Sequence, residues 1–177
     1  MRICLAFRFA FLFLIGIFSS SGYADHEKEA NFYILYGVAD YEDEFVSGLD
    51  PTGIAIRFVP ATDKWFGYEA RLGFGISEGS DNGVEVDVQT IVGFYLNAHS
   101  NIGNALSVYG VAGYTWVRYD LKSGGTPSLS SEDESGFGYG FGIDLGKQNS
   151  MKLNLEFMQI LDKSDFDLST ISIGVSF

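Results

Sequence analysis

Eight charged residues stand in segments of the sequence that are otherwise built from alternating apolar residues. They are Arg57, Glu69, Arg71, Glu85, Asp87, Asp144, Lys152 and Glu156. Charges in an apolar setting are stable when they pair with one another or line water. The sequence therefore predicts an internal network of ion pairs. Two roles for it stay open: a static set of pairs that fills the interior, or a gate in which partner exchange around Arg71 opens a narrow path.

Groups that could perform catalysis are not brought together by the sequence. A general base must lie within hydrogen-bond reach of the proton it removes, but His26 is near the start of the chain and His99 is in a predicted turn, away from the serines of SLSSEDES. The glycines of GFGYGFG alternate with aromatic residues, whereas a dinucleotide loop has the spacing G-x-G-x-x-G. We expect no enzyme activity, no cofactor and no metal centre.

Clusters of carboxylates lie in predicted connections between the alternating segments. They are Glu42, Asp43 and Glu44, then Glu132, Asp133 and Glu134, and finally Asp162, Asp165 and Asp167. Clustered carboxylates can bind hard divalent cations, but no cluster has the spacing of a calcium-binding loop. A solvated anionic surface is the simpler interpretation.

The stretch GFGYGFGIDLG, residues 136–146, shows which element must position these charges. Successive side chains of a strand point to opposite faces. One face therefore carries Phe137, Tyr139 and Phe141, and the other carries only glycines and Asp144. This period of two predicts a strand with one bulky apolar face and one nearly bare face.

Eight segments with this alternation account for nearly all of the sequence after Ala30. They span residues 31–41, 52–59, 65–77, 84–98, 105–119, 136–147, 151–161 and 166–177. Most reach the 9 to 11 residues or so that a tilted membrane-spanning strand requires. The connections after the first, third, fifth and seventh segments are polar and acidic, and the others are shorter on average. Short turns at one end and longer loops at the other are typical of a membrane barrel with an even number of strands.

The alternation alone leaves the direction of the apolar faces open, because a soluble lipocalin-like barrel would turn them inward. An eight-stranded barrel has an interior only just wide enough for side chains. Inward-facing glycines would make room for the long side chains of Arg57, Arg71 and Lys152. We therefore predict an all-β, eight-stranded, antiparallel up-and-down transmembrane β-barrel with its apolar rows toward lipid.

The N-terminal residues predict a secretory signal peptide, residues 1–24, followed by one barrel domain, residues 25–177. Arg2 and Arg8 precede an apolar run that ends in the small residues before Ala24, the pattern of a cleaved signal. Cys4, the only cysteine, lies inside it. The signal has two arginines and no acidic residue, so its removal changes the net charge from −12 to −14. This charge disfavours nucleic acid, whose binding rests on cationic contacts to phosphate.

The last strand places Ile171, Ile173, Val175 and Phe177 on one face. This ending resembles the C-terminal signal that the outer-membrane barrel assembly machinery of Gram-negative bacteria recognises. The stretches YEARLGFG, VYGVAGYTWV, SGFGYGFGIDL and LNLEFMQILDK resemble those of the small outer-membrane β-barrel domain, or porin-family, proteins of the OmpA/OmpX type. The resemblance implies the bacterial outer membrane as location, with its lipid and lipopolysaccharide as partners.

These features predict a monomeric barrel with a structural or surface-interaction role, in envelope integrity or in contacts through acidic extracellular loops. The alternatives are a narrow porin-like channel for ions or small solutes, gated by interior charge pairs, and a soluble periplasmic carrier. Aromatic residues at strand ends are expected in interfacial girdles. They are Trp65, Trp116, Tyr119 and Tyr41. In the segment 105–119 both rows of side chains fit the lipid face, so its facing stays open.

Overall fold

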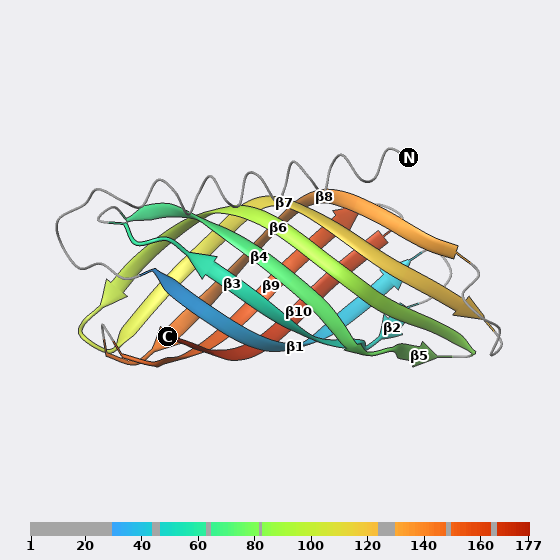
Figure 1. The fold of residues 1–177 in the computed structure, drawn as a ribbon, viewed down its shortest axis with the longest axis horizontal. Coiled ribbons are helices and arrows are strands. Elements are labelled where there is room, and N and C mark those ends of the chain that lie inside the picture. Colours follow the sequence, from blue (N-terminus) through green and yellow to red (C-terminus); the bar gives the residue numbers. More distant parts are fainter. Residues whose placement is uncertain are drawn as a thin grey trace.

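The computed structural model describes residues 30–43, 47–62, 65–81, 83–123, 130–147, 150–163 and 166–177. The predicted signal peptide, residues 1–24, lies outside them. Eight long antiparallel strands follow one another along the chain (Figure 1). They are β1 (Asn31–Asp43), β3 (Thr52–Val59), β4 (Phe66–Ser77), β6 (Val84–Ile102), β7 (Leu106–Ser123), β8 (Ser130–Leu145), β9 (Lys152–Lys163) and β10 (Phe166–Ser176). In the described part of the chain, no helix has the length and apolar character needed to cross a membrane.

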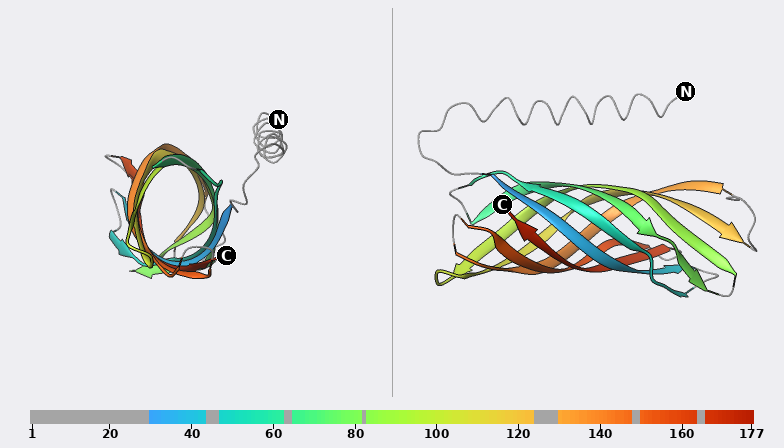
Figure 2. Two further views of the ribbon diagram at one scale, coloured as in Figure 1. Left: turned by 90° about the vertical axis from the view of Figure 1, so that its left-hand side faces the viewer. Right: turned by 60° about the horizontal axis from the view of Figure 1, so that its bottom comes forward.

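The sheet closes on itself, which confirms the predicted eight-stranded barrel. β1 pairs with β3 on one side and with β10 on the other, from Tyr33 opposite Ser176 to Asp43 opposite Phe166. Figure 2 shows the resulting closed ring. Backbone hydrogen bonds join Phe32 and Phe177 in both directions, at 3.3 and 2.9 Å. We call this end of the barrel the terminal end and the opposite one the outer end.

The strands continue into regions predicted as connections at the outer end. Two three-residue strands, β2 (Ser47–Leu49) and β5 (Gly79–Asp81), pair with β1 and β6. β6, β7 and β8 project beyond their neighbours at this end (Figure 1). β7 and β8 exceed their predicted ranges here, whereas β6 is longer only at the terminal end, by residues 99–102. The assignment of Glu132, Asp133 and Glu134 to a loop was wrong, because these residues belong to β8 and pair with β7. The loop assignment of Glu42 and Asp43 was wrong for the same reason, since both belong to β1 and pair with β10.

The apolar rows face outward, as the interior glycines predicted. Phe137 and Phe141 on β8 are 60% and 64% exposed, whereas Gly138, Gly140 and Gly142 between and beside them are buried or nearly so. The same geometry settles the facing of β7. Its inward row is Tyr109, Val111, Thr115, Val117 and Tyr119, and its outward row includes Tyr114 and Trp116.

The inward glycines are required because other groups occupy the space of their missing side chains. A Cβ at Gly142 would collide with the phenol of Tyr109, and one at Gly140 would lie 2.6 Å from the sulfur of Met158. Gly110 on β7 is different, since its Cβ would meet only a carbonyl oxygen at 3.8 Å.

We therefore expect Gly142→Ala to lower the free energy of unfolding by about 1–3 kcal/mol, the usual cost of overpacking. Gly110→Ala is the matched control and should change it little, because its added methyl group has room. Urea unfolding of the refolded barrels in lipid vesicles measures both values. Equal losses in the two variants would contradict the packing of Tyr109 against Gly142.

The polarity of the two faces reverses toward the outer end of β6. Its register with β7 shifts between Val88 and Thr90, so Gln89 forms a β-bulge. A bulge adds one residue and changes which side chains face inward. As a result Val86 is fully buried and Val88 nearly so, and the interior positions predicted for Glu85 and Asp87 were wrong. These carboxylates lie on the outer surface, where Asp87 is 3.9 Å from Lys122.

Apolar side chains fill the interior near the outer end, and we call this group the outer cluster. It comprises Tyr41, Leu49, Val86, Val88, Tyr119, Ile160, Leu161, Phe166 and Leu168. Ring centroids lie 5.3 Å apart between Tyr41 and Phe166 and 5.0 Å apart between Tyr119 and Phe166. The expected girdle positions of Tyr41 and Tyr119 were therefore wrong, while Trp65 and Trp116 do face outward.

A charge introduced into the outward apolar band tests the facing. Leu96→Arg places a guanidinium in the middle of this band on β6, and we expect it to lower the free energy of unfolding in lipid by about 2–4 kcal/mol. Gln89→Arg on the same strand should cost less, because Gln89 is exposed at the bulge beside Asp87. Urea titrations of both variants give the comparison. The reverse order would contradict the placement of the apolar band at Leu96 and of the polar zone at Gln89.

Candidate functional site

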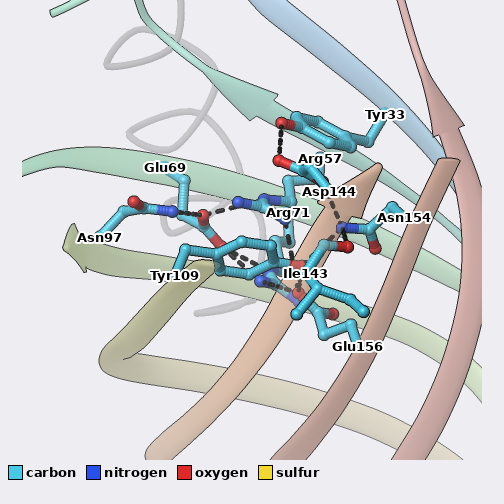
Figure 3. A network of polar contacts seen from close by, with 10 residues as sticks. All are labelled: Tyr33, Arg57, Glu69, Arg71, Asn97, Tyr109, Ile143, Asp144, Asn154 and Glu156. Atoms are coloured by element: carbon cyan, nitrogen blue, oxygen red, sulfur yellow. Dashed lines mark hydrogen bonds and ion pairs between the residues drawn. The ribbon is translucent and has the colours of Figure 1, made fainter. Parts of the chain in front are cut away.

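Four charged side chains meet in the middle of the barrel (Figure 3). Arg57 on β3 lies 2.9 Å from Glu69 on β4, measured from Nε to Oε2. The guanidinium of Arg71 donates two hydrogen bonds to Glu156 on β9, at 2.5 and 2.8 Å, and one to Glu69 at 2.6 Å. Arg57 Nη1 completes the set at 3.5 Å from Glu156. The two cations and two carboxylates balance, and we call them the charge network.

Neighbouring polar and aromatic groups hold the charge network in place. Asn97 donates a hydrogen bond to Glu69 at 2.7 Å, and the hydroxyl of Tyr109 donates one to Glu156 at 2.8 Å. The guanidinium of Arg57 lies between the rings of Tyr33 and Tyr109, 4.4 and 4.1 Å from their centroids. Such cation–π contacts stabilise a cation that has lost its water.

A second group of hydrogen bonds adjoins the charge network on its terminal side. Tyr33 donates to Asp144 at 2.9 Å, and the amide of Asn154 donates to Asp144 at 2.7 Å and to the Tyr109 oxygen at 2.8 Å. Tyr109 therefore connects Asp144 with Glu156 through Asn154 (Figure 3).

The structure brings together Arg57, Glu69, Arg71 and Glu156, with Asp144 nearby. Lys152 does not join them: it is partly exposed at the start of β9, and no ion pair to it is found among the described residues. Tyr33 and Tyr109 were missed as network residues. Tyr109 would have been found from its inward row, had the facing of β7 been known.

Two cavities lie on opposite sides of the charge network. The first, the vestibule, has a volume of about 880 Å³ and reaches from the terminal end, at Asn31 and Phe177, to Arg57. His99 and Lys152 also line it. The second has about 80 Å³, is mostly apolar and touches Arg71 and Glu156. The interior thus changes from open and polar to charged and packed, and then to the apolar outer cluster.

Charged side chains gather at the outer end of the barrel, above the apolar band, and we call this zone the outer belt. Its carboxylates include Asp40, Glu42, Glu78, Glu85, Asp87, Asp120, Glu132, Asp133 and Glu134, and its cations include Arg118, Lys122 and Lys163. Of the predicted loop carboxylates, Glu42 is exposed; Glu44 and the side chain of Asp43 lie outside the described residues. No group of histidine, cysteine and acidic residues suited to a metal ion occurs within the described ranges.

Ion pairs join strands within the outer belt. Arg118 on β7 donates two hydrogen bonds to Asp133 on β8, at 2.7 and 2.9 Å, and these lower the pKa of Asp133. The ion pair therefore gives its full stabilisation of the folded barrel above about pH 4, the ordinary range of aspartate. This stabilisation is lost as the pH falls through the lowered pKa of Asp133. Lys122 contacts Glu78, and Lys163 contacts Glu134.

The C-terminal row lies on the outside of β10. Ile171, Ile173 and Phe177 are exposed and Val175 partly so. Ile171, Ile173 and Val175 lie opposite Val38, Tyr36 and Ile34 of β1, in that order. The apolar band therefore continues across the seam where β10 pairs with β1.

The first and last strands, β1 and β10, pair and close the barrel. A closed barrel with outward apolar rows and a charged interior is an integral membrane β-barrel. Residues 9–177 match the family of the outer membrane protein beta-barrel domain. The chain belongs to this family, and it is therefore a bacterial outer-membrane barrel protein. No curated protein matches the sequence significantly.

Solved barrels with low sequence identity share the fold. Ail, the attachment invasion locus protein of Yersinia pestis, is 15% identical with a TM-score of 0.65, over 86% of this chain and 100% of Ail. Neisserial surface protein A is 11% identical with a TM-score of 0.66, over 84% and 98% of the two chains. OprG from Pseudomonas aeruginosa is 15% identical with a TM-score of 0.52, over 85% and 97%.

Proposed function

We propose that the protein is a closed outer-membrane barrel with a structural or surface-contact role, carried out by the outer belt and without catalysis. The observation that carries this proposal is the filling of the interior. The charge network occupies the middle, and the outer cluster occupies the space above it with buried side chains such as Leu161 and Leu168. Since an eight-stranded barrel is only just wide enough for its own side chains, this packing supports a closed lumen.

The remaining parts of the proposal concern the envelope. The signal, residues 1–24, is removed on export to a Gram-negative outer membrane, and residues 25–177 form the mature monomer. The outward row that ends in Phe177 is the segment offered to the barrel assembly machinery. The outer belt faces the lipopolysaccharide leaflet. Barrels of this kind have short turns on the periplasmic side and longer segments on the outside, and the outer belt is at the end with the longer segments.

Liposome swelling tests the closed lumen. Vesicles containing the refolded residues 25–177 are diluted into isosmotic solutions of small sugars or amino acids, and swelling reports their entry. We expect these vesicles to swell no faster than vesicles without protein. Parallel vesicles that contain a general porin serve as the positive control. Swelling well above that of empty vesicles would contradict the proposal.

A gated channel is the second candidate, favoured by the two cavities on either side of the charge network. The vestibule reaches Arg57, and the smaller cavity touches Arg71 and Glu156. Rearrangement of these pairs would extend the vestibule toward the outer end. In this case Arg71→Ala must change the ion conductance, and an unchanged conductance argues against the gate.

The charge of the outer belt predicts which soluble ligands it rejects. Ail has been crystallised with the heparin analogue sucrose octasulfate. In the outer belt of this chain carboxylates outnumber cations, and each described cation already contacts a carboxylate. We expect no binding of sucrose octasulfate at physiological salt in titration calorimetry, because like charges repel. Saturable binding would contradict the assigned charge balance.

A further inference from the structure

The vestibule has the size of a ligand site and is closed at its inner end. Its volume of about 880 Å³ falls within the range of about 300–1,000 Å³ that is typical of small-molecule sites. Asn31 and Phe177 lie at its entrance on the terminal end, and Arg57 and Tyr109 lie at its inner limit, where both contact the charge network. With the lumen closed as proposed above, a solute that enters the vestibule leaves by the same opening.

Asparagine side chains supply uncharged polar groups to the vestibule. They are Asn31 on β1, Asn97 and Asn101 on β6, and Asn104 in the turn after β6. Asn97 is held by Glu69 and Asn101 by Ser107. Within the described ranges, no hydrogen bond is formed by the side-chain amide of Asn31 or Asn104. A side-chain amide both donates and accepts hydrogen bonds, so these two groups suit the hydroxyl groups of a ligand.

Lys152, the first residue of β9, brings a positive charge to the vestibule. Its stem packs against the end of β8, where its Cγ lies 3.0 Å from the position that a Cβ of Gly146 would take. It lies opposite Ser176 on β10, and Ser176 lies opposite Tyr33 on β1, which places Lys152 on the inward wall. Lys152 is partly exposed, and no ion pair holds it in the described part of the chain.

The other charges beside the vestibule are balanced or covered. Arg57 is buried and belongs to the charge network. Asp144 is the only carboxylate among the described residues that line the vestibule. It is buried, and its two oxygens accept hydrogen bonds from Tyr33 and Asn154. A solute in the vestibule therefore meets the ammonium group of Lys152 as the accessible charge.

We propose that the vestibule binds a small hydroxylated organic anion, with the carboxylate or phosphate group of the ligand at Lys152 and its hydroxyl groups at the asparagine amides. Hydrogen bonds between a charged donor and an anionic oxygen are among the strongest in proteins, and a cleft with low-dielectric walls focuses the attraction. A single lysine matches one oxyanion group. The narrow interior of an eight-stranded barrel excludes a large polyanion such as sucrose octasulfate, so the rejection of that sugar expected above is unchanged.

This binding site goes beyond the surface-contact role proposed above and lies at the opposite end of the barrel. With the outer belt toward the lipopolysaccharide leaflet, the terminal end opens to the periplasm. The ligand is therefore a periplasmic solute, and it approaches Lys152 without passing the carboxylates of the outer belt.

Matched pairs of solutes test the chemistry of the ligand. Gluconate is compared with sorbitol, which has an alcohol in place of the carboxylate, and glycerol 3-phosphate is compared with glycerol. Titration calorimetry uses the refolded residues 25–177 in lipid nanodiscs, which leave both ends of the barrel accessible. Low salt and about pH 7.5, above the ordinary pKa of histidine, keep His99 in the lining mostly uncharged. We expect at least one anion to bind and its neutral partner to bind at least about tenfold more weakly. The anion that binds more tightly identifies the preferred oxyanion group.

Two lysine variants locate the binding. Lys152→Gln removes the charge in the vestibule and should weaken binding of the anion by about tenfold. Lys147→Gln removes the same charge from an exposed residue at the same end that lines neither cavity, and should have little effect. No binding of either anion to the folded barrel, equal binding of the neutral partners, or equal weakening by the two variants would overturn the inference. All of these are results on binding, whereas only the passage of solutes or ions overturns the closed lumen.

Discussion

Arg71→Ala is expected to lower the free energy of unfolding of the barrel by about 3–5 kcal/mol, the usual loss when one partner of a buried ion pair is removed. Arg71 donates to both Glu69 and Glu156, and these carboxylates are almost fully buried. Without Arg71, only Arg57 remains to balance two negative charges. Urea unfolding in lipid vesicles, followed by tryptophan fluorescence, measures the change.

A charge-balanced double variant is the control for this experiment. Arg71→Met with Glu156→Gln removes one charge of each sign and keeps Glu69 paired with Arg57 and Asn97. We expect the double variant to be more stable than Arg71→Ala, because no uncompensated charge is left in the interior. If it is as unstable as Arg71→Ala or more so, charge balance is not what the four residues contribute.

Phe166→Ala is expected to be about as costly, with a loss of about 3–5 kcal/mol, typical of a buried phenylalanine. Its ring packs between Tyr41 and Tyr119 in the outer cluster, and its removal leaves a cavity where strands β1, β7 and β10 meet. Urea unfolding again gives the value.

Phe137→Ala provides the comparison, because Phe137 is on the outward face of β8 and its removal opens no internal cavity. Its loss should be clearly smaller than that of Phe166→Ala. Equal losses would mean that the outer cluster is no better packed than the lipid-facing surface.

The fold could be predicted because period-two alternation is a local property of the sequence. Phe137, Tyr139 and Phe141 against their glycine neighbours define both faces of β8 without any knowledge of the partner strands. The steric limit on an eight-stranded interior then decides which face is inside. Strand order and closure follow, since each strand pairs with the next and β10 with β1.

The errors come from features that the alternation does not contain. One extra residue at Gln89 exchanges the two faces of β6, so Glu85 and Asp87 were placed inside although they lie outside. Tyr41 and Tyr119 lie on the inward rows of β1 and β7. They belong to the outer cluster because the interior of the barrel is apolar near its outer end. Above the lipid an ordinary apolar interior is favourable, and there the membrane pattern no longer holds.

The charge network was predictable in its members but not in its pairing. Arg57 and Glu156 are 99 residues apart and meet only because β3 and β9 face each other across the closed barrel. Lys152 has the right charge and the right strand but lies too near the terminal end, beside the vestibule. Height along the barrel depends on strand tilt and register, which the sequence pattern leaves open.

Planar-bilayer recording of refolded residues 25–177 tests the central claim most directly, that the lumen is closed by the charge network and the outer cluster. The folded state is first confirmed by the faster migration of the unheated barrel in electrophoresis. The account predicts an inserted barrel without current steps. Discrete, reproducible steps, altered by Arg71→Ala, would contradict it and make the charge network the gate of a channel.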